Sequence, residues 1–134
     1  MPTVRRFEDI EAWKDSMILA DAVYSASNAG AFAKDFGLRD QMRRAAVSIS
    51  SNIAEGFERN SKTEFIRFLA IAKGSAGELR SQLYLARRQG YVTDEVFNNL
   101  YSQVFGVSGK ISRFAEYLRN DTAVKTRTRS TTNL

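Results

Sequence analysis

The 134-residue chain contains no cysteine and no histidine, and its one proline is Pro2. Without cysteine there is no disulfide, thiolate nucleophile or Cys-ligated zinc, and without histidine the commonest general base and transition-metal ligand is missing. Serine triads, histidine-dependent nucleases and di-iron bundles with Glu-x-x-His ligands are therefore excluded. Only carboxylate-and-lysine or magnesium-dependent chemistry remains, and we expect a protein that is not an enzyme and that carries no cofactor or metal.

Long apolar runs are missing as well, since no stretch approaches the roughly 20 residues that cross a bilayer. The charged N-terminus, with Arg5, Arg6, Glu8 and Asp9, lacks the apolar centre of a signal peptide. We therefore expect a soluble, cytoplasmic protein of one domain. Its expected organisation is an N-terminal arm over residues 1–8, a helical bundle over residues 9–120, and a disordered basic tail over residues 121–134.

Apolar residues recur at helical spacing in four segments, and strand signals are weak throughout. The predicted helices cover about residues 9–27, 38–57, 61–89 and 93–120. Ser61 is the expected N-cap of the third helix, with Glu64 completing a capping box, and Thr93 is the expected N-cap of the fourth. Because the connections are short, the sequence predicts an all-α, antiparallel, up-down-up-down four-helix bundle.

Each predicted helix carries one apolar stripe for the core. In the first helix the stripe is Ile10, Trp13, Met17, Ala20 and Tyr24. In the second it is Leu38, Met42, Ala45, Ile49, Ile53 and Gly56, and in the third it is Phe65, Phe68 or Leu69, Ala72, Ala76, Leu79, Leu83 and Ala86. In the fourth it is Phe97, Leu100, Val104, Val107, Ile111, Phe114 and Leu118.

The helix faces opposite these stripes consist mainly of small, uncharged residues. Residues 45–54 contain no charge, although an ordinary surface helix gives its outer face to charged side chains. Glycine inside a helix costs about 1 kcal/mol relative to alanine, so exposed rows of glycine suggest a packing role. We expect these faces to form the interface of a ring-like homo-oligomer, against the alternative that they pack within the monomer. The expected interface residues are Val47, Ser50, Ser51, Ala54, Ala70, Gly74, Gly77, Ser81, Ser102, Gly106 and Gly109.

Asn52, Glu55 and Gly56 close the second predicted helix and are interpreted as structural residues. A buried asparagine can fix helix register, and a glutamate near an arginine can form a partly buried ion pair. Glu55 alone, without a second carboxylate at matched spacing, forms no catalytic constellation. Gly56 begins the turn toward the third helix.

The formal net charge is +5, and the positive excess lies in the middle of the chain and in its tail. Such an asymmetry permits an anionic partner, most plausibly nucleic acid, but a solvated basic surface explains it equally well. The candidate phosphate-binding residues are Arg39, Arg43, Arg59, Lys62, Arg67, Arg80, Arg87, Arg88, Lys125, Arg127 and Arg129. Tyr84, Tyr91 and Tyr101 could stack on bases, although aromatic residues in helices more often lie in a core or interface.

Three segments of the chain resemble a known family. They are Phe7-Glu8-Asp9-x-x-x-Trp13, Arg39-x-Gln41-x-Arg43-Arg44-Ala45-Ala46-x-Ser48-Ile49-x-Ser51-Asn52-Ile53-Ala54-Glu55-Gly56, and Glu64-Phe65-Ile66-Arg67-Phe68-Leu69. The chain is similar, over about residues 7–118, to the bacterial four-helix bundle proteins named after the ribosomal-RNA intervening sequences that encode some of them. The family often has proline where this chain has Ser50, so any kink there is expected to be weaker.

The resemblance implies an antiparallel bundle, and related proteins assemble as pentameric barrels. Similar bundles serve as accessory subunits of diversity-generating retroelements, and those relatives are thought to bind nucleic acid and a reverse transcriptase. The resemblance implies no catalytic residue. The leading hypothesis is therefore a non-enzymatic homo-oligomer, a pentamer by analogy, that binds structured RNA or an RNA–protein complex. The alternatives are a protein-interaction scaffold without nucleic-acid binding and, less favoured, a magnesium-dependent nuclease that uses Glu55.

Overall fold

The computed structural model describes residues 4–121, so the tail candidates Lys125, Arg127 and Arg129 lie outside the described residues. The described part has helices and turns and no strand, which confirms the all-α part of the predicted fold class. Its elements are a short 3-10 helix η1 (Phe7–Asp9) and the α-helices α1 (Glu11–Ala26), α2 (Gly30–Lys34), α3 (Phe36–Glu58), α4 (Lys62–Arg88) and α5 (Asp94–Asn120). Over residues 4–121, no helix combines the length and apolarity that a membrane span needs.

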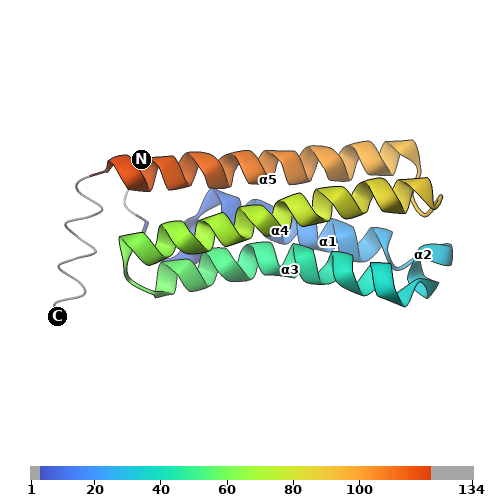
Figure 1. Ribbon diagram of the computed structural model, residues 1–134, viewed down its shortest axis with the longest axis horizontal. Coiled ribbons are helices and arrows are strands. Elements are labelled where there is room, and N and C mark those ends of the chain that lie inside the picture. Colours follow the sequence, from blue (N-terminus) through green and yellow to red (C-terminus); the bar gives the residue numbers. More distant parts are fainter. Residues whose placement is uncertain (1–3, 122–134) are drawn as a thin grey trace.

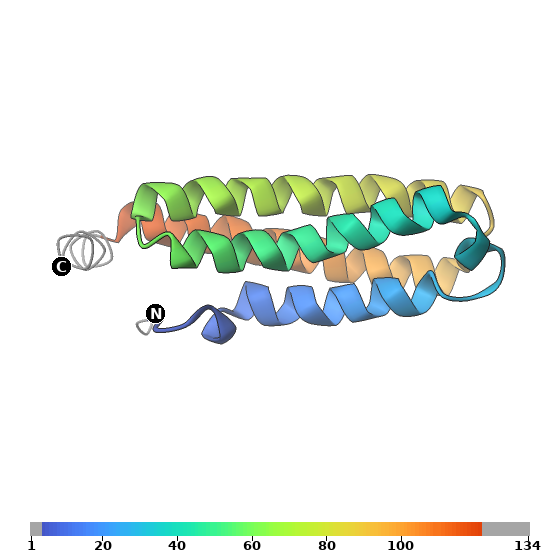
Figure 2. The same cartoon turned by 90° about the horizontal axis from the view of Figure 1, so that it is seen from below.

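The four long helices lie side by side (Figures 1 and 2), and each packs against two of the others. Helix α3 contacts α1 and α4, while α5 contacts α4 and α1. The short α2 packs on α3, and η1 packs on α1 and α3. The lines of contact between α3 and α4 and between α4 and α5 are called the α3–α4 seam and the α4–α5 seam.

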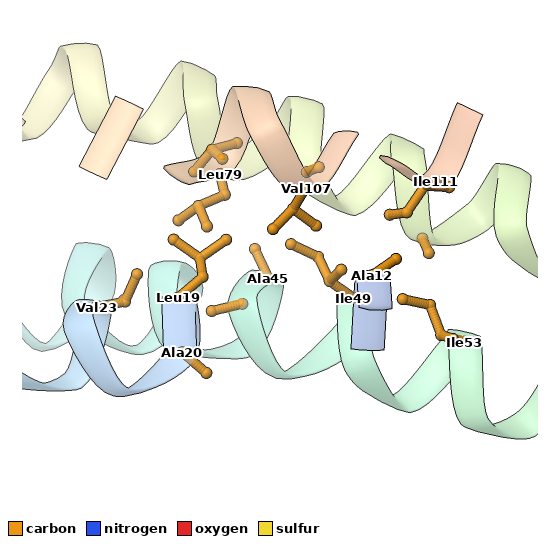
Figure 3. Close-up of a cluster of buried hydrophobic side chains, with 14 of the residues drawn as sticks. Ala12, Leu19, Ala20, Val23, Ala45, Ile49, Ile53, Leu79, Val107 and Ile111 are labelled. Atoms are coloured by element: carbon orange, nitrogen blue, oxygen red, sulfur yellow. The ribbon is translucent and has the colours of Figure 1, made fainter. Parts of the chain in front are cut away.

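The core runs along the whole bundle, and Figure 3 shows Leu19, Ile49, Leu79 and Val107 converging in its middle. The stripes predicted for the second, third and fourth helices are confirmed, except that Leu38 is only half-buried. Burial of these side chains is the main favourable contribution to folding.

The stripe predicted for the first helix is wrong at two positions. Met17 and Tyr24 are 42% and 43% exposed, whereas Leu19 and Val23 are buried. Ala12 and Ser16 continue the buried face, and both lie at helical spacing from Leu19. Two apolar patterns therefore overlap on α1. The buried pattern includes the small residues Ala12 and Ser16, and it is hard to recognise in the sequence because alanine and serine give a weak apolar signal. The Ser16 hydroxyl donates to the Trp13 carbonyl at 2.7 Å, which satisfies it inside the core.

The helix starts follow ordinary capping chemistry. The Ser61 hydroxyl accepts from the Glu64 amide at 3.3 Å, and the Thr93 hydroxyl accepts from the Val96 amide at 3.1 Å, so both predicted N-caps are confirmed. The reciprocal half of the capping box is absent at Ser61, because the Glu64 carboxylate accepts from Arg67 instead. The second long helix in the chain, α3, begins earlier than predicted, since the Asp35 side chain accepts from the Leu38 amide at 3.1 Å.

Candidate nucleic-acid interface

The middle of α3 is joined to the middle of α4 by a chain of polar side chains. The Asn52 amide nitrogen donates to the Ser48 carbonyl at 2.7 Å and to the Ser48 hydroxyl at 2.9 Å. That hydroxyl lies 2.9 Å from the Ser75 hydroxyl on α4. Because hydrogen bonds across a seam are made at only one register, Asn52, through Ser48, fixes how α3 lies against α4.

The basic candidates near the α3–α4 turn are paired with carboxylates. Arg59 lies 3.0 Å from Glu55 and 3.8 Å from Glu64. Arg67 forms a two-pronged contact with Glu64, with donor–acceptor distances of 3.0 and 3.2 Å. This hydrogen bonding is the largest cause of the lowered pKa of Glu64. The positive charge at this end of the bundle is therefore largely neutralised, which makes it a weak phosphate site.

The two carboxylates that come together near the α3–α4 turn share an arginine as their partner. Glu55 and Glu64 both approach the Arg59 guanidinium. Among residues 4–121, no group of three or more acidic side chains is arranged to hold a metal ion.

Three other basic candidates bind groups of their own chain. Arg39 donates to the Ala33 carbonyl at 3.0 Å and pairs with Asp40 at 2.9 Å. Arg43 donates to the Ser27 hydroxyl at 2.8 Å, which ties α3 to the end of α1. The Lys62 ammonium donates to the Arg119 carbonyl at 3.1 Å, at the C-terminus of α5. These side chains already have structural partners.

The remaining basic candidates, Arg80, Arg87 and Arg88, lie on α4. Within residues 4–121 none of them forms a salt bridge, and neither does Lys73. Lys73, Arg80 and Arg87 are seven residues apart, so they share one side of the helix. We call Lys73, Arg80 and Arg87, together with the adjacent Arg88, the α4 basic strip. Lys73 was not among the predicted residues, although its spacing from Arg80 could have identified it.

Beside this strip, aromatic rings line the seam between α4 and α5. Tyr84 of α4 lies 5.2 Å from Phe97 and 5.9 Å from Tyr101, between ring centroids. Tyr101 is also 5.7 Å from Phe97 and stacks on Phe105 at 6.3 Å. We call Tyr84, Phe97, Tyr101 and Phe105 the aromatic row. Phe105 was missed in the sequence, although Phe97, Tyr101 and Phe105 recur at steps of four.

Arg87 of the α4 basic strip contacts the aromatic row. Its guanidinium lies 3.9 Å above the Phe97 ring centroid and 5.7 Å from that of Tyr84. A hydrogen bond with Tyr101 is the largest cause of the raised pKa of Tyr84, while Arg87 and Arg80 act in the opposite direction. The third tyrosine considered for base stacking lies elsewhere, since Tyr91 stacks on Phe32 at 5.3 Å and donates to Asp35 at 2.9 Å.

Most residues predicted to form a subunit interface lie on the surface. Those exposed in the monomer are Val47, Ser51, Ala70, Gly74, Gly77, Ser81, Ser102 and Gly106. A Cβ atom added at Gly74, Gly77 or Gly106 would meet nothing within 4 Å, so packing inside the monomer does not require glycine there. Ala54 and Gly109 are half-buried. Ser50 is only 7% exposed and donates to the Val47 carbonyl at 3.1 Å, so it does not belong to the exposed face.

Gly106 also borders a shallow groove between α1 and α5. The groove has a volume of about 210 Å³. Its lining residues are Asp15, Ile18, Ser102, Gln103, Gly106, Val107 and Lys110. The Lys110 ammonium donates to the Asp15 carboxylate across it.

Comparison with known proteins adds a family and a fold. Residues 8–113 match the family described as 23S rRNA-intervening sequence protein. A crystal structure of a protein of unknown function from the S23 ribosomal protein family of Bacteroides thetaiotaomicron is similar, with a TM-score of 0.71 and 24% sequence identity. The similarity covers 78% of this chain and 97% of that one, which supports the helical fold. No curated protein matches the chain.

Proposed function

Since the chain belongs to the family of 23S rRNA-intervening sequence proteins, we propose that it is a non-enzymatic, cytoplasmic RNA-binding protein. It binds structured RNA, or an RNA–protein complex, through the α4 basic strip. In this proposal the four long helices run up-down-up-down, and several copies assemble into a ring through their small-residue faces.

One observation carries the RNA-binding part. Arg80, Arg87 and Arg88 keep their charge unpaired within residues 4–121, whereas Arg59 and Arg67 share it with Glu55 and Glu64. Phosphate groups bind where positive charge is clustered and not already satisfied. The Arg87 guanidinium lies over the Phe97 ring, and a guanidinium can form two hydrogen bonds to one phosphate through its N–H groups.

The open glycines support the assembly part. Gly74, Gly77 and Gly106 leave backbone accessible on α4 and α5, where another helix could approach closely. Assembly would repeat the α4 basic strip around a ring and strengthen RNA binding by multivalency. The size of the ring rests on the pentamers of related proteins.

Two double variants of equal charge test the binding site. Arg80→Gln with Arg87→Gln should weaken binding of a structured RNA hairpin and reduce the slope of log K against log salt by about one per lost phosphate contact. The matched control is Arg59→Gln with Arg67→Gln, which removes the same charge from the neutralised end and should change the slope little. Circular dichroism checks that both variants remain helical.

The wild type itself can contradict the proposal. If it binds no RNA at low salt, or binds with an affinity that salt does not reduce, the RNA-binding function is wrong. Self-association in light scattering without any RNA affinity would instead favour a protein-interaction scaffold. Equal losses in both double variants would show that net charge, and not the α4 basic strip, governs binding.

A further inference from the structure

The aromatic row contains two rings that the fold does not need to bury. Phe105 is 60% exposed and Tyr84 is 45% exposed, while Phe97 is buried. Among the aromatic rings of residues 4–121, Phe105 stacks only on Tyr101, with an angle of 17° between the ring planes. One face of Phe105 is thus supported by a stacked ring, and most of its surface faces solvent.

Positive charge lies beside Tyr84, one of these two rings. Arg80 and Arg87 both act electrostatically on the Tyr84 hydroxyl. Arg87 is held against Phe97, so its position is restricted before any ligand arrives. The acidic residues closest in sequence are Asp94 and Glu95 in the first turn of α5 and Glu78 on α4, and none of them forms a salt bridge with Arg80 or Arg87. The surface therefore combines apolar ring faces with cations whose charge complements a polyanion.

Unpaired nucleotides offer the complementary chemistry. Each carries a flat base that can stack on an aromatic ring and a phosphate that can bind an arginine. Bases inside a duplex already stack on each other, so a duplex would leave the Phe105 ring exposed. A protein partner would cover an apolar ring, but it would have to supply carboxylates to balance Arg80 and Arg87.

We infer that the α4–α5 seam binds unpaired RNA bases, which stack on the exposed rings of Phe105 and Tyr84 while the neighbouring phosphates bind Arg80 and Arg87. This inference rests on the RNA-binding function proposed above and names the class of RNA that the site prefers. Phe105 supplies the base platform, and Arg87 orients the strand along the seam.

Variants at Phe105 test this inference with an oligoadenylate strand and a blunt RNA duplex of the same length as probes. Phe105→Leu keeps an apolar side chain but removes the ring, and should weaken oligoadenylate binding roughly ten-fold with an unchanged salt slope. Phe105→Trp, the matched control, keeps a ring and should bind at least as tightly as the wild type. Duplex binding should stay the same in all three proteins.

The outcomes separate this inference from the function on which it rests. If the wild type binds neither probe, both are wrong. If both probes bind with normal salt dependence and Phe105→Leu binds oligoadenylate like the wild type, RNA binding stands and base stacking at Phe105 is wrong. If Phe105→Leu instead changes the oligomeric state in light scattering, the ring belongs to an interface between copies, which also overturns the inference.

Discussion

Gly56 of α3 lies directly against Phe68 of α4. A Cβ atom built on Gly56 would stand 2.7 Å from the Phe68 Cβ and 3.0 Å from the Phe65 Cδ1, closer than packed carbon atoms approach. The two helices meet here just before the tight turn that joins them, where Asn60 has a positive φ of 56°. Gly56 is therefore required by contact between α3 and α4.

Gly56→Ala should destabilise the fold by roughly 1–3 kcal/mol, the usual cost of an extra methyl group in a filled space. The clash is with the Cβ of Phe68, which is fixed to the backbone of α4, so a side-chain rotation cannot relieve it. Urea denaturation followed by circular dichroism measures the change in the free energy of unfolding.

Gly74→Ala is the matched control for this prediction. A Cβ at Gly74 meets nothing within 4 Å in the monomer, so alanine should raise the free energy of unfolding of the single chain by about 0.5–1 kcal/mol through its higher helix propensity. Equal effects at the two glycines would show that the close approach of α3 and α4 does not limit residue size at Gly56.

The sequence predicted the helices well where the apolar side chains are large. Leu79, Leu83 and Ile111 mark the core faces of α4 and α5 unambiguously, and their burial is confirmed. The rotation of α1 was mispredicted at Met17 and Tyr24, because the buried face there includes small residues and depends on which helices cover it. The periodicity of apolar residues shows that a helix has an apolar face, but it does not show which helices will cover that face.

The candidate site was less predictable for the same reason. Arg59 and Arg80 look alike in the sequence, yet Arg59 meets two glutamates and Arg80 meets none among residues 4–121. Which arginines are neutralised depends on turns and seams that bring side chains together across helices. The steps of four from Phe97 to Phe105 were visible in the sequence, but the exposure of Phe105 was not.

Asn52→Ala should lower the free energy of unfolding by about 1–2 kcal/mol, because it removes two hydrogen bonds to Ser48 at a half-buried seam. Ser51→Ala, at the exposed neighbouring position, should change it by less than about 0.5 kcal/mol. A double-mutant cycle with Ser75→Ala should reveal coupling, since Ser48 contacts both residues. Strict additivity of the two effects would contradict a shared network.

Tyr91 should make the stability depend on alkaline pH. Its hydrogen bond to Asp35 is the largest cause of its raised pKa, above the usual value of 10.0. A raised pKa in the folded state stabilises the fold fully below the pKa of the unfolded chain, and this contribution disappears as pH rises through the folded value. Thermal unfolding should therefore show a loss of melting temperature above about pH 10 that Tyr91→Phe reduces.

Tyr24→Phe is the control for this titration, because the Tyr24 ring lies against Arg43, whereas Asp35 accepts its hydrogen bond from Tyr91. The alkaline loss should persist in that variant. If Tyr91→Phe shows the same alkaline profile as the wild type, the Asp35 contact does not contribute to stability and the connection between α2 and the α4–α5 turn is held by the stacking of Phe32 on Tyr91 alone.

Gly77→Leu should break the proposed assembly without loss of helicity. The position is open in the monomer, so leucine should fit the single chain but keep a second helix at a distance. Ala54→Glu, which places a charge on the uncharged face of α3, should have the same effect. Light scattering reports the mass, and circular dichroism reports the helicity.

Ser25→Leu places the same leucine side chain at an exposed position of α1 outside the predicted interface, and it should leave the mass unchanged. The two interface variants separate two explanations for the small-residue faces. If both assemble like the wild type, or if the wild type is a monomer, another partner must explain the open backbone at Gly74 and Gly77. If only Gly77→Leu dissociates, the interface uses α4 and leaves α3 outside, so the ring would be built from a narrower surface than the sequence predicts.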